Sequence, residues 1–159
     1  MIGLFLHEID VGLSVDLGSY HFTRENILVF AKKYDPQPFH LSEEGGRAGP
    51  FGALSASGWH TAAGWMKCYV ATNEAVRVTL EAAGKVLPEG GPSPGFTNLK
   101  WLKPVLPGDT VSYRGIVTAK RELASRPAWG LVTSFNEGFN QRGELVFSFE
   151  GKVLTARRV

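Results

Sequence analysis

The segment Gly58–Gly84 constrains the fold most, because it contains no proline and its first charged residue is Lys67. A helix of this length would run roughly 40 Å at 1.5 Å per residue. Since the first two turns carry no charge, we expect them to be buried almost all round. Further along, Glu74, Arg77 and Glu81 recur at helical spacing on one face, which predicts a solvated face. One long, largely buried helix needs other elements to cover it.

Strands are the elements expected to cover this helix. Residues 87–95 are rich in proline and glycine and predict a loop. After this loop, apolar and polar residues alternate as they do in half-buried strands, over 96–105, 111–119, 131–135 and 145–149. The segment Asn140–Gly143 suits a hairpin connection between the last two. A long apolar helix followed by alternating strands predicts an α+β fold, in which a curved antiparallel sheet packs around the helix.

The residues before the long helix predict shorter elements. Residues 4–22 alternate loosely, which predicts two short strands around a turn at Gly18. Thr23 is the expected N-cap of a helix that must end near Tyr34, since two prolines follow closely. Residues 42–57 are rich in glycine, serine and alanine, and we expect them to form short turns.

Composition narrows the function classes. With 159 residues, 43% of them hydrophobic and 20% charged, the chain fits a single domain over residues 1–159. A net charge of +2 without a basic stripe argues against a nucleic-acid partner. Cys68 is the only cysteine, which excludes an intrachain disulfide and argues against a structural zinc site. The start lacks a basic leader, and no apolar run is long enough to span a bilayer, so we expect a cytoplasmic protein with no membrane partner.

The densest polar cluster is the segment Tyr34–His40, in which Asp35 and His40 are five positions apart with two prolines between them. Prolines stiffen a loop and can hold a carboxylate and an imidazole at a set separation, as a general acid–base pair requires. The alternative is structural, because Asp before Pro commonly forms a turn and a histidine beside Phe39 is commonly a partly buried ring.

A second candidate feature is the start of the long helix, at Ser57 and Gly58. Free backbone N–H groups at a helix N-terminus attract negative charge, and a glycine lets a substrate carbonyl approach the backbone closely. An oxyanion site needs both properties. The alternative is that Ser57 is only an N-cap and Gly58 only a packing glycine. Among the neighbouring residues, we expect His60, Trp59, Trp65 and Met66 to belong to the core.

Taken together, these two segments resemble the MaoC-like dehydratases, which include (R)-specific enoyl-CoA hydratases. Asp35 and His40 keep the spacing of that family's hydratase motif, and Pro38 keeps its proline. Gln37 replaces the usual asparagine and Tyr34 a frequent glycine. The glycine at the start of the central helix corresponds to Gly58. The resemblance spans roughly residues 13–156 and also covers the later strands.

The resemblance implies a hotdog fold, a homodimer or a dimer of dimers, and an acyl-CoA thioester as substrate. It implies reversible addition of water to a trans-2-enoyl thioester, with no metal and no organic cofactor. By position, Asp35 would act as the base on water, and His40 would orient that water and share in proton transfer to the α-carbon. The N–H of Gly58, beside Ser57, would hold the thioester oxygen. Two alternatives stay open: an acyl-CoA thioesterase, and a non-catalytic acyl-CoA-binding or accessory subunit.

Overall fold

The computed structural model of the chain describes residues 3–158. Residues 1, 2 and 159, which belong to the predicted domain, lie outside the described residues. In chain order, the elements are η1 (Leu6–Glu8), β1 (Ser14–His21), α1 (Arg24–Tyr34), α2 (Pro38–Leu41), α3 (Glu43–Ala48), α4 (Gly58–Ala82), β2 (Gly95–Trp101), β3 (Thr110–Glu122), β4 (Trp129–Phe139) and β5 (Leu145–Ala156).

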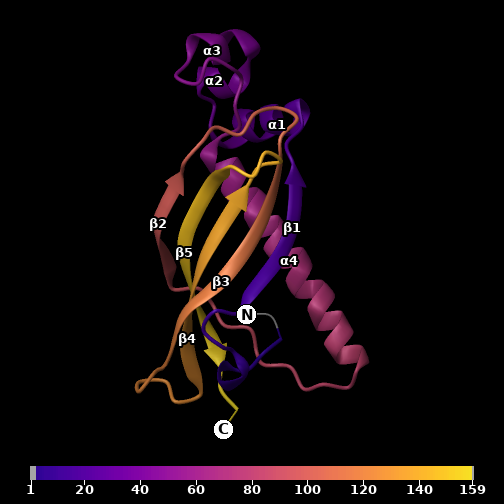
Figure 1. Cartoon of the computed structure of the whole chain (residues 1–159), viewed down its shortest axis with the longest axis vertical. Helices are drawn as coiled ribbons and strands as arrows, with labels where there is room; N and C mark the ends of the chain where they lie inside the picture. Colours follow the sequence, from indigo (N-terminus) through magenta and orange to yellow (C-terminus); the bar gives the residue numbers. More distant parts are fainter. Residues whose placement is uncertain (1–2, 159) are drawn as a thin grey trace.

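The strands form one antiparallel sheet in the order β1-β3-β4-β5-β2. This sheet is curved, and α4 crosses one of its faces, while α1, α2 and α3 lie together at one end (Figure 1). Side-chain hydrogen bonds tie the helix to the sheet. The Tyr113 hydroxyl donates to the Thr61 carbonyl at 2.9 Å, Thr72 Oγ1 donates to the Leu17 carbonyl at 3.1 Å, and the Tyr20 hydroxyl lies 3.4 Å from His60 Nε2. The predicted α+β hotdog architecture is confirmed.

The sheet covers only one side of α4, so the helix buries a narrow stripe rather than its whole circumference. The buried residues of the helix are His60, Thr61, Gly64 and Cys68. Trp59 is 52% exposed and Met66 is 50% exposed, so the expectation that the first two turns are buried all round is wrong, as is the assignment of these two side chains to the core. Trp65 packs partly buried against the main core cluster.

The segment before α1 is one strand and not two. β1 pairs with β3 from Ser14 to His21, and the register shifts between Asp16 and Gly18. Gly18 has a φ of 81° and its N–H donates to Asp16 Oδ1 at 2.8 Å, so the glycine marks a bulge within the strand where a turn was predicted.

Residues 42–57 also differ from the expectation, because they contain helix α3. Ser42 caps this helix by accepting a hydrogen bond from the Gly45 N–H at 3.0 Å. Gly46 lies so close to the backbone of Leu54 that a Cβ there would be 2.1 Å from the Leu54 nitrogen. The glycines of this segment therefore permit close packing of a short helix. Composition alone could not distinguish such a helix from a series of turns. The strand expected over 96–105 ends earlier, at Trp101.

Other expectations are confirmed. Thr23 caps α1 by accepting from the Asn26 N–H at 3.1 Å. The β4–β5 hairpin closes where predicted, with the Gly143 N–H donating to the Asn140 carbonyl at 2.9 Å. On the outer face of α4, Arg77 pairs with both Glu74 and Glu81.

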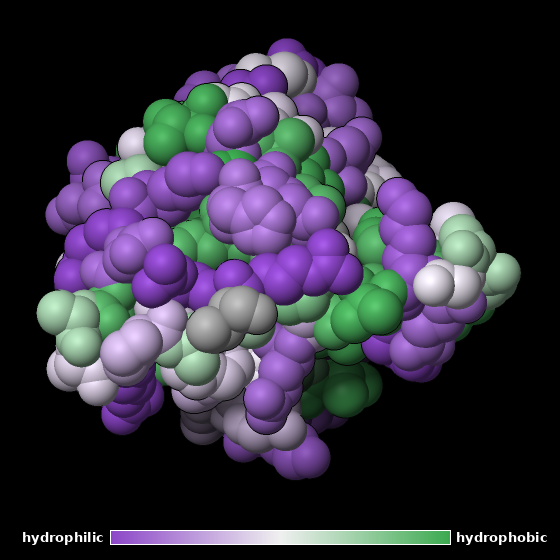
Figure 2. Space-filling model, turned by 90° about the horizontal axis from the view of Figure 1, so that it is seen from below, coloured by the Kyte–Doolittle hydropathy of each residue, from purple (hydrophilic) through white to green (hydrophobic). Residues whose placement is uncertain are grey.

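The surface at the end that carries both termini is mostly hydrophilic, with apolar atoms in scattered groups (Figure 2). In the part of the chain that the structure describes, no helix combines the length and the apolar character needed to cross a bilayer.

The bond from Tyr113 to the α4 backbone gives the first prediction. Tyr113 is 1% exposed, so removing its hydroxyl in Tyr113→Phe deletes a buried hydrogen bond. We expect the free energy of unfolding to fall by about 1 kcal/mol, measured by urea denaturation. Tyr69→Phe is the matched control, since the Tyr69 hydroxyl forms no hydrogen bond with the described residues. Equal losses in the two variants would contradict this role of Tyr113.

Candidate functional site

The structure brings all four predicted site residues, Asp35, His40, Ser57 and Gly58, to one cavity of about 310 Å³. Asp35 directly follows α1, His40 lies in α2, and Ser57 and Gly58 begin α4. The segment after β2 closes the opposite wall. The remaining lining residues are Gln37, Phe39, Phe51, Ala56, Trp59, Thr61, Trp101, Leu102, Lys103, Pro104 and Val105.

Backbone hydrogen bonds fix the loop that carries the carboxylate and the imidazole. The Asp35 N–H donates to the Ala31 carbonyl at 2.9 Å and so still belongs to the last turn of α1. The Gln37 N–H donates to the Asp35 carbonyl at 2.8 Å, and the His40 N–H donates to the Gln37 carbonyl at 2.9 Å. Pro38 stands at the start of α2, where its missing N–H costs nothing. The five-residue spacing is thus held by the backbone itself.

Two side chains hold the carboxylate of Asp35. Ser57 Oγ donates to Oδ2 at 2.6 Å, and Gln37 Nε2 donates to Oδ1 at 2.8 Å. Burial opposes ionisation of Asp35, but the hydrogen bonds from Ser57 and Gln37 and the charge of His40 outweigh it and hold the pKa of Asp35 below its ordinary value. The carboxylate is therefore ionised at neutral pH, with one donor on each oxygen.

His40 is buried, with 5% of its surface exposed, and a hydrogen bond to the backbone of Ser55 fixes the orientation of its ring. Its Nδ1 lies 2.7 Å from the Ser55 carbonyl, which can only accept, so Nδ1 carries a proton. The other ring nitrogen, Nε2, lies 3.5 Å from Asp35 Oδ2. In the neutral ring, this tautomer leaves the Nε2 lone pair facing the carboxylate side of the cavity.

Ser57 caps α4, as the alternative interpretation expected, and it also binds Asp35. Its Oγ accepts a hydrogen bond from the Trp59 N–H at 3.2 Å, as an N-cap does, while its proton goes to Asp35. The hydroxyl therefore connects the start of α4 to the loop of Asp35. The Gly58 N–H forms no hydrogen bond with the described residues and lies beside the cavity.

Gly58 has a packing role as well. The indole of Trp101 lies against it so closely that a Cβ at position 58 would be 2.5 Å from Trp101 Cε2. Trp59 meets the same indole edge-on, with ring centroids 5.2 Å apart. Both tryptophans are about half exposed and form one rim of the cavity.

Sequence reasoning missed two residues of this site. Gln37 was noted only as a departure from a motif, although its place two residues after Asp35 lets its amide reach that carboxylate. Trp101 carried no signal in the sequence, because it comes from a distant strand and reaches the cavity only through the sheet topology.

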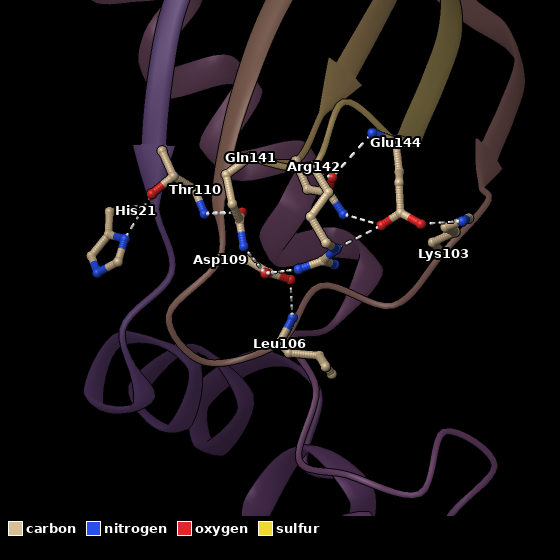
Figure 3. A network of polar contacts seen from close by, with 9 residues as sticks. His21, Lys103, Leu106, Asp109, Thr110, Gln141, Arg142 and Glu144 are labelled. Atoms are coloured by element: carbon tan, nitrogen blue, oxygen red, sulfur yellow. Dashed lines mark hydrogen bonds and ion pairs between the residues drawn. The ribbon is translucent and has the colours of Figure 1, made fainter.

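A polar network supports the wall formed by residues 101–105 (Figure 3). The buried carboxylate of Asp109 accepts from the Leu106 N–H at 2.9 Å and from Gln141 Nε2 at 2.7 Å. Arg142 joins Asp109 to Glu144, and Glu144 pairs with Lys103. Lys103 is thus engaged in an ion pair at the cavity edge, which ties the segment after β2 to the β4–β5 hairpin.

The remaining histidines stand apart from this site. His60 is 4% exposed and packs among Tyr20, Phe22 and Phe30, so the expectation that it belongs to the core is confirmed. His21 bonds Thr110 at the end of β1. Within residues 3–158, no cluster of three or more His, Cys, Asp or Glu residues is placed to hold a metal ion.

Comparison with known proteins places the chain in a family and supports its fold. A MaoC-like dehydratase from Rhodospirillum rubrum is 35% identical, with a TM-score of 0.76, and the match covers 99% of both chains. The (R)-hydratase PhaJ1 from Pseudomonas aeruginosa is 20% identical with a TM-score of 0.66 over 98% of this chain and 88% of that one, which shows the shared hotdog fold.

A mesaconyl-CoA hydratase from Cereibacter sphaeroides is 39% identical over 64 residues, and this match covers 40% of the chain but only 18% of that protein. No protein-family model matches the chain. The full-length similarity to the Rhodospirillum protein shows that the chain belongs to the MaoC-like dehydratase family.

His60 predicts how stability depends on pH. Burial lowers the pKa of His60 from 6.5 to about 4, so the folded protein keeps this ring neutral where the unfolded chain would protonate it. The stability that follows from this is fully present above pH 6.5 and is lost as pH falls from there to about 4. We expect up to about 3 kcal/mol of pH dependence to disappear in His60→Leu, measured by denaturation across that range. The control is His7→Leu, because His7 is exposed. If the free energy of unfolding of His60→Leu depended on pH as steeply as that of the native protein, this account would be contradicted.

Ser57 predicts the ionisation of Asp35. In Ser57→Ala, the pKa of Asp35 should rise, because the carboxylate loses a donor while its burial remains. The measurement is an NMR titration of the Asp35 carboxyl carbon, with Ser42→Ala, in the cap of α3, as the matched control. An Asp35 pKa that stays in place in Ser57→Ala would show that the hydroxyl does not stabilise the charge.

Proposed function

We propose that this protein is an acyl-thioester hydratase/dehydratase, which reversibly adds water to a trans-2-enoyl-CoA. The observation that carries the proposal is the pairing of an ionised carboxylate with an imidazole of fixed tautomer, Asp35 Oδ2 and His40 Nε2 at 3.5 Å, in one cavity with an unpaired backbone N–H. The names of relatives support it, since they include an (R)-hydratase and a mesaconyl-CoA hydratase.

The chemistry follows from the residues around the cavity. A water molecule held between Asp35 and His40 gives a proton to this pair as its oxygen bonds to the β-carbon of the substrate. Negative charge then develops on the thioester oxygen, and the N–H of Gly58 stabilises it there. The α-carbon takes up a proton in exchange, with His40 as the donor. In the reverse direction, the same groups remove water from a 3-hydroxyacyl thioester.

The proposal includes the assembly and the partners. The substrate is an acyl-CoA thioester, and the chemistry requires neither a metal nor an organic cofactor. We infer that the protein forms a homodimer or a dimer of dimers in the cytoplasm. Proteins of similar fold form the HadBC and ChsH1–ChsH2 complexes of Mycobacterium tuberculosis. Size-exclusion chromatography would therefore also reveal assembly with a second, related subunit.

The test is to follow the loss of the conjugated thioester absorbance when the protein meets a panel of trans-2-enoyl-CoAs. We expect turnover by the native protein and a loss of at least about 100-fold in kcat for Asp35→Asn and for His40→Ala. Asp10→Asn and His7→Ala, both exposed and outside the cavity, are the matched controls.

Other outcomes would overturn the proposal. Release of free thiol from saturated acyl-CoA, without hydration, would identify a thioesterase. Acyl-CoA binding with no turnover, together with a stable hetero-complex, would identify an accessory subunit. Equal rates for the native protein and both site variants would remove the roles given to Asp35 and His40.

A further inference from the structure

A second cavity, of about 160 Å³, lies between α4 and the face of the sheet that the helix covers. Its walls are mainly apolar and include Trp65, Met66 and Tyr69 from the helix and Phe149 from β5. Residues of both core clusters border it: Leu17 and Phe149 from the main cluster, and Val132 from the smaller cluster formed around η1 by Leu6, Ile9, Val117 and Val132. The core is therefore interrupted here, in the middle of the sheet, where bulky apolar side chains would ordinarily pack.

The floor of this cavity is polar and is formed by Asn136 and Ser134 of β4. Asn136 is 4% exposed, and its amide lies between two glycines of the neighbouring strands. A Cβ at Gly115 would be 3.0 Å from Asn136 Oδ1, and one at Gly151 would be 3.2 Å from Nδ2. Gly115 pairs directly with Asn136, and Gly151 pairs with Ser134. The two glycines thus make room for a buried amide on the inner face of the sheet.

The hydrogen bonding of this amide is incomplete. Asn136 Nδ2 donates to the carbonyl and to Oγ of Ser134, at 3.2 and 3.1 Å. No described residue donates to Asn136 Oδ1. Asn136 Oδ1 is therefore available to accept a hydrogen bond from a group that enters the cavity. A ligand hydroxyl could donate to it and at the same time accept from the Ser134 hydroxyl.

Along α4, a small, wholly apolar cavity of about 130 Å³ lies between this cavity and the one that holds Asp35 and His40. It shares Trp59 with the catalytic cavity, and it shares Trp65, Met66, Phe96 and Phe149 with the cavity of Asn136. From Gly58 to Trp65 the helix rises roughly 10 Å, which corresponds to an extended chain of roughly eight bonds.

We propose that these cavities hold the acyl chain of the substrate and that Asn136 and Ser134 select a chain carrying an uncharged hydroxyl near its far end. This inference rests on the proposed hydratase function. The hydroxyl donates to Asn136 Oδ1 and accepts from Ser134 Oγ, so both polar side chains of the floor gain a partner. A plain alkyl chain leaves Oδ1 unpaired. A carboxylate cannot donate to Oδ1, so it suits this floor less well than a hydroxyl does, although Lys152 also lines the cavity.

The experiment compares hydration of ω-hydroxy and unsubstituted trans-2-enoyl-CoAs of matched length, around eight carbons, with an ω-carboxy analogue as a third arm. For the native protein we expect kcat/KM to be about tenfold higher for the ω-hydroxy substrate. Asn136→Leu should abolish this preference while plain enoyl-CoA is still hydrated, and Ser134→Ala should weaken it. Asn73→Leu, on α4 and outside this cavity, should keep the native ratio. Melting temperatures show which variants fold.

The outcomes separate this inference from the proposed function. Turnover of plain chains with no preference for the hydroxyl by the native protein, or a preference that survives in folded Asn136→Leu, overturns the inference and leaves the hydratase assignment intact. If no enoyl-CoA is turned over, the proposed function fails. Calorimetry then decides the inference, because tighter binding of an ω-hydroxyacyl-CoA than of its alkyl counterpart supports it and equal binding overturns it.

Discussion

The hydrogen bond from Ser57 to Asp35 joins the two segments on which the site depends. It connects the loop after α1 to the N-cap of α4, over 22 positions of sequence, at 2.6 Å. Because Ser57 also caps the helix, the carboxylate is tied to the element that packs along the sheet. The tyrosine at position 113 fixes that helix one turn further on. The relative position of carboxylate, imidazole and helix start is therefore set by the core of the fold and not by a free loop.

Two cavities that contain polar side chains lie along the same helix. At its start, Asp35, His40 and the Gly58 amide share a cavity that is open to water. Two turns further on, Asn136 sits in an apolar enclosure against the middle of the sheet. A small apolar cavity lies between them, with Trp59 at the end near Asp35 and His40. A reactive pair, an apolar cavity and a polar end point are what selective recognition of one kind of acyl chain would require.

Sequence patterns predicted what depends on local chemistry. Helix capping by Thr23, the long helix from Gly58 and the β4–β5 hairpin follow from residues near one another in the chain. The spacing of Asp35 and His40 identified the candidate pair, because neighbouring prolines limit the backbone. Burial around α4 was not predictable, since the half-exposed Trp59 and Met66 depend on which side the sheet covers. Gly18 was read as a turn, because a bulge and a turn use the same positive φ.

The central claim is that the pair formed by Asp35 and His40 adds water across a conjugated double bond. Reaction of a trans-2-enoyl-CoA in deuterium oxide, followed by mass spectrometry and NMR of the product, tests this most directly. The account predicts a 3-hydroxyacyl-CoA that carries one non-exchanging deuterium on its α-carbon, placed stereospecifically. Recovery of the starting enoyl-CoA with no hydroxyacyl product, or a free acid in place of the hydroxyacyl thioester, would contradict it.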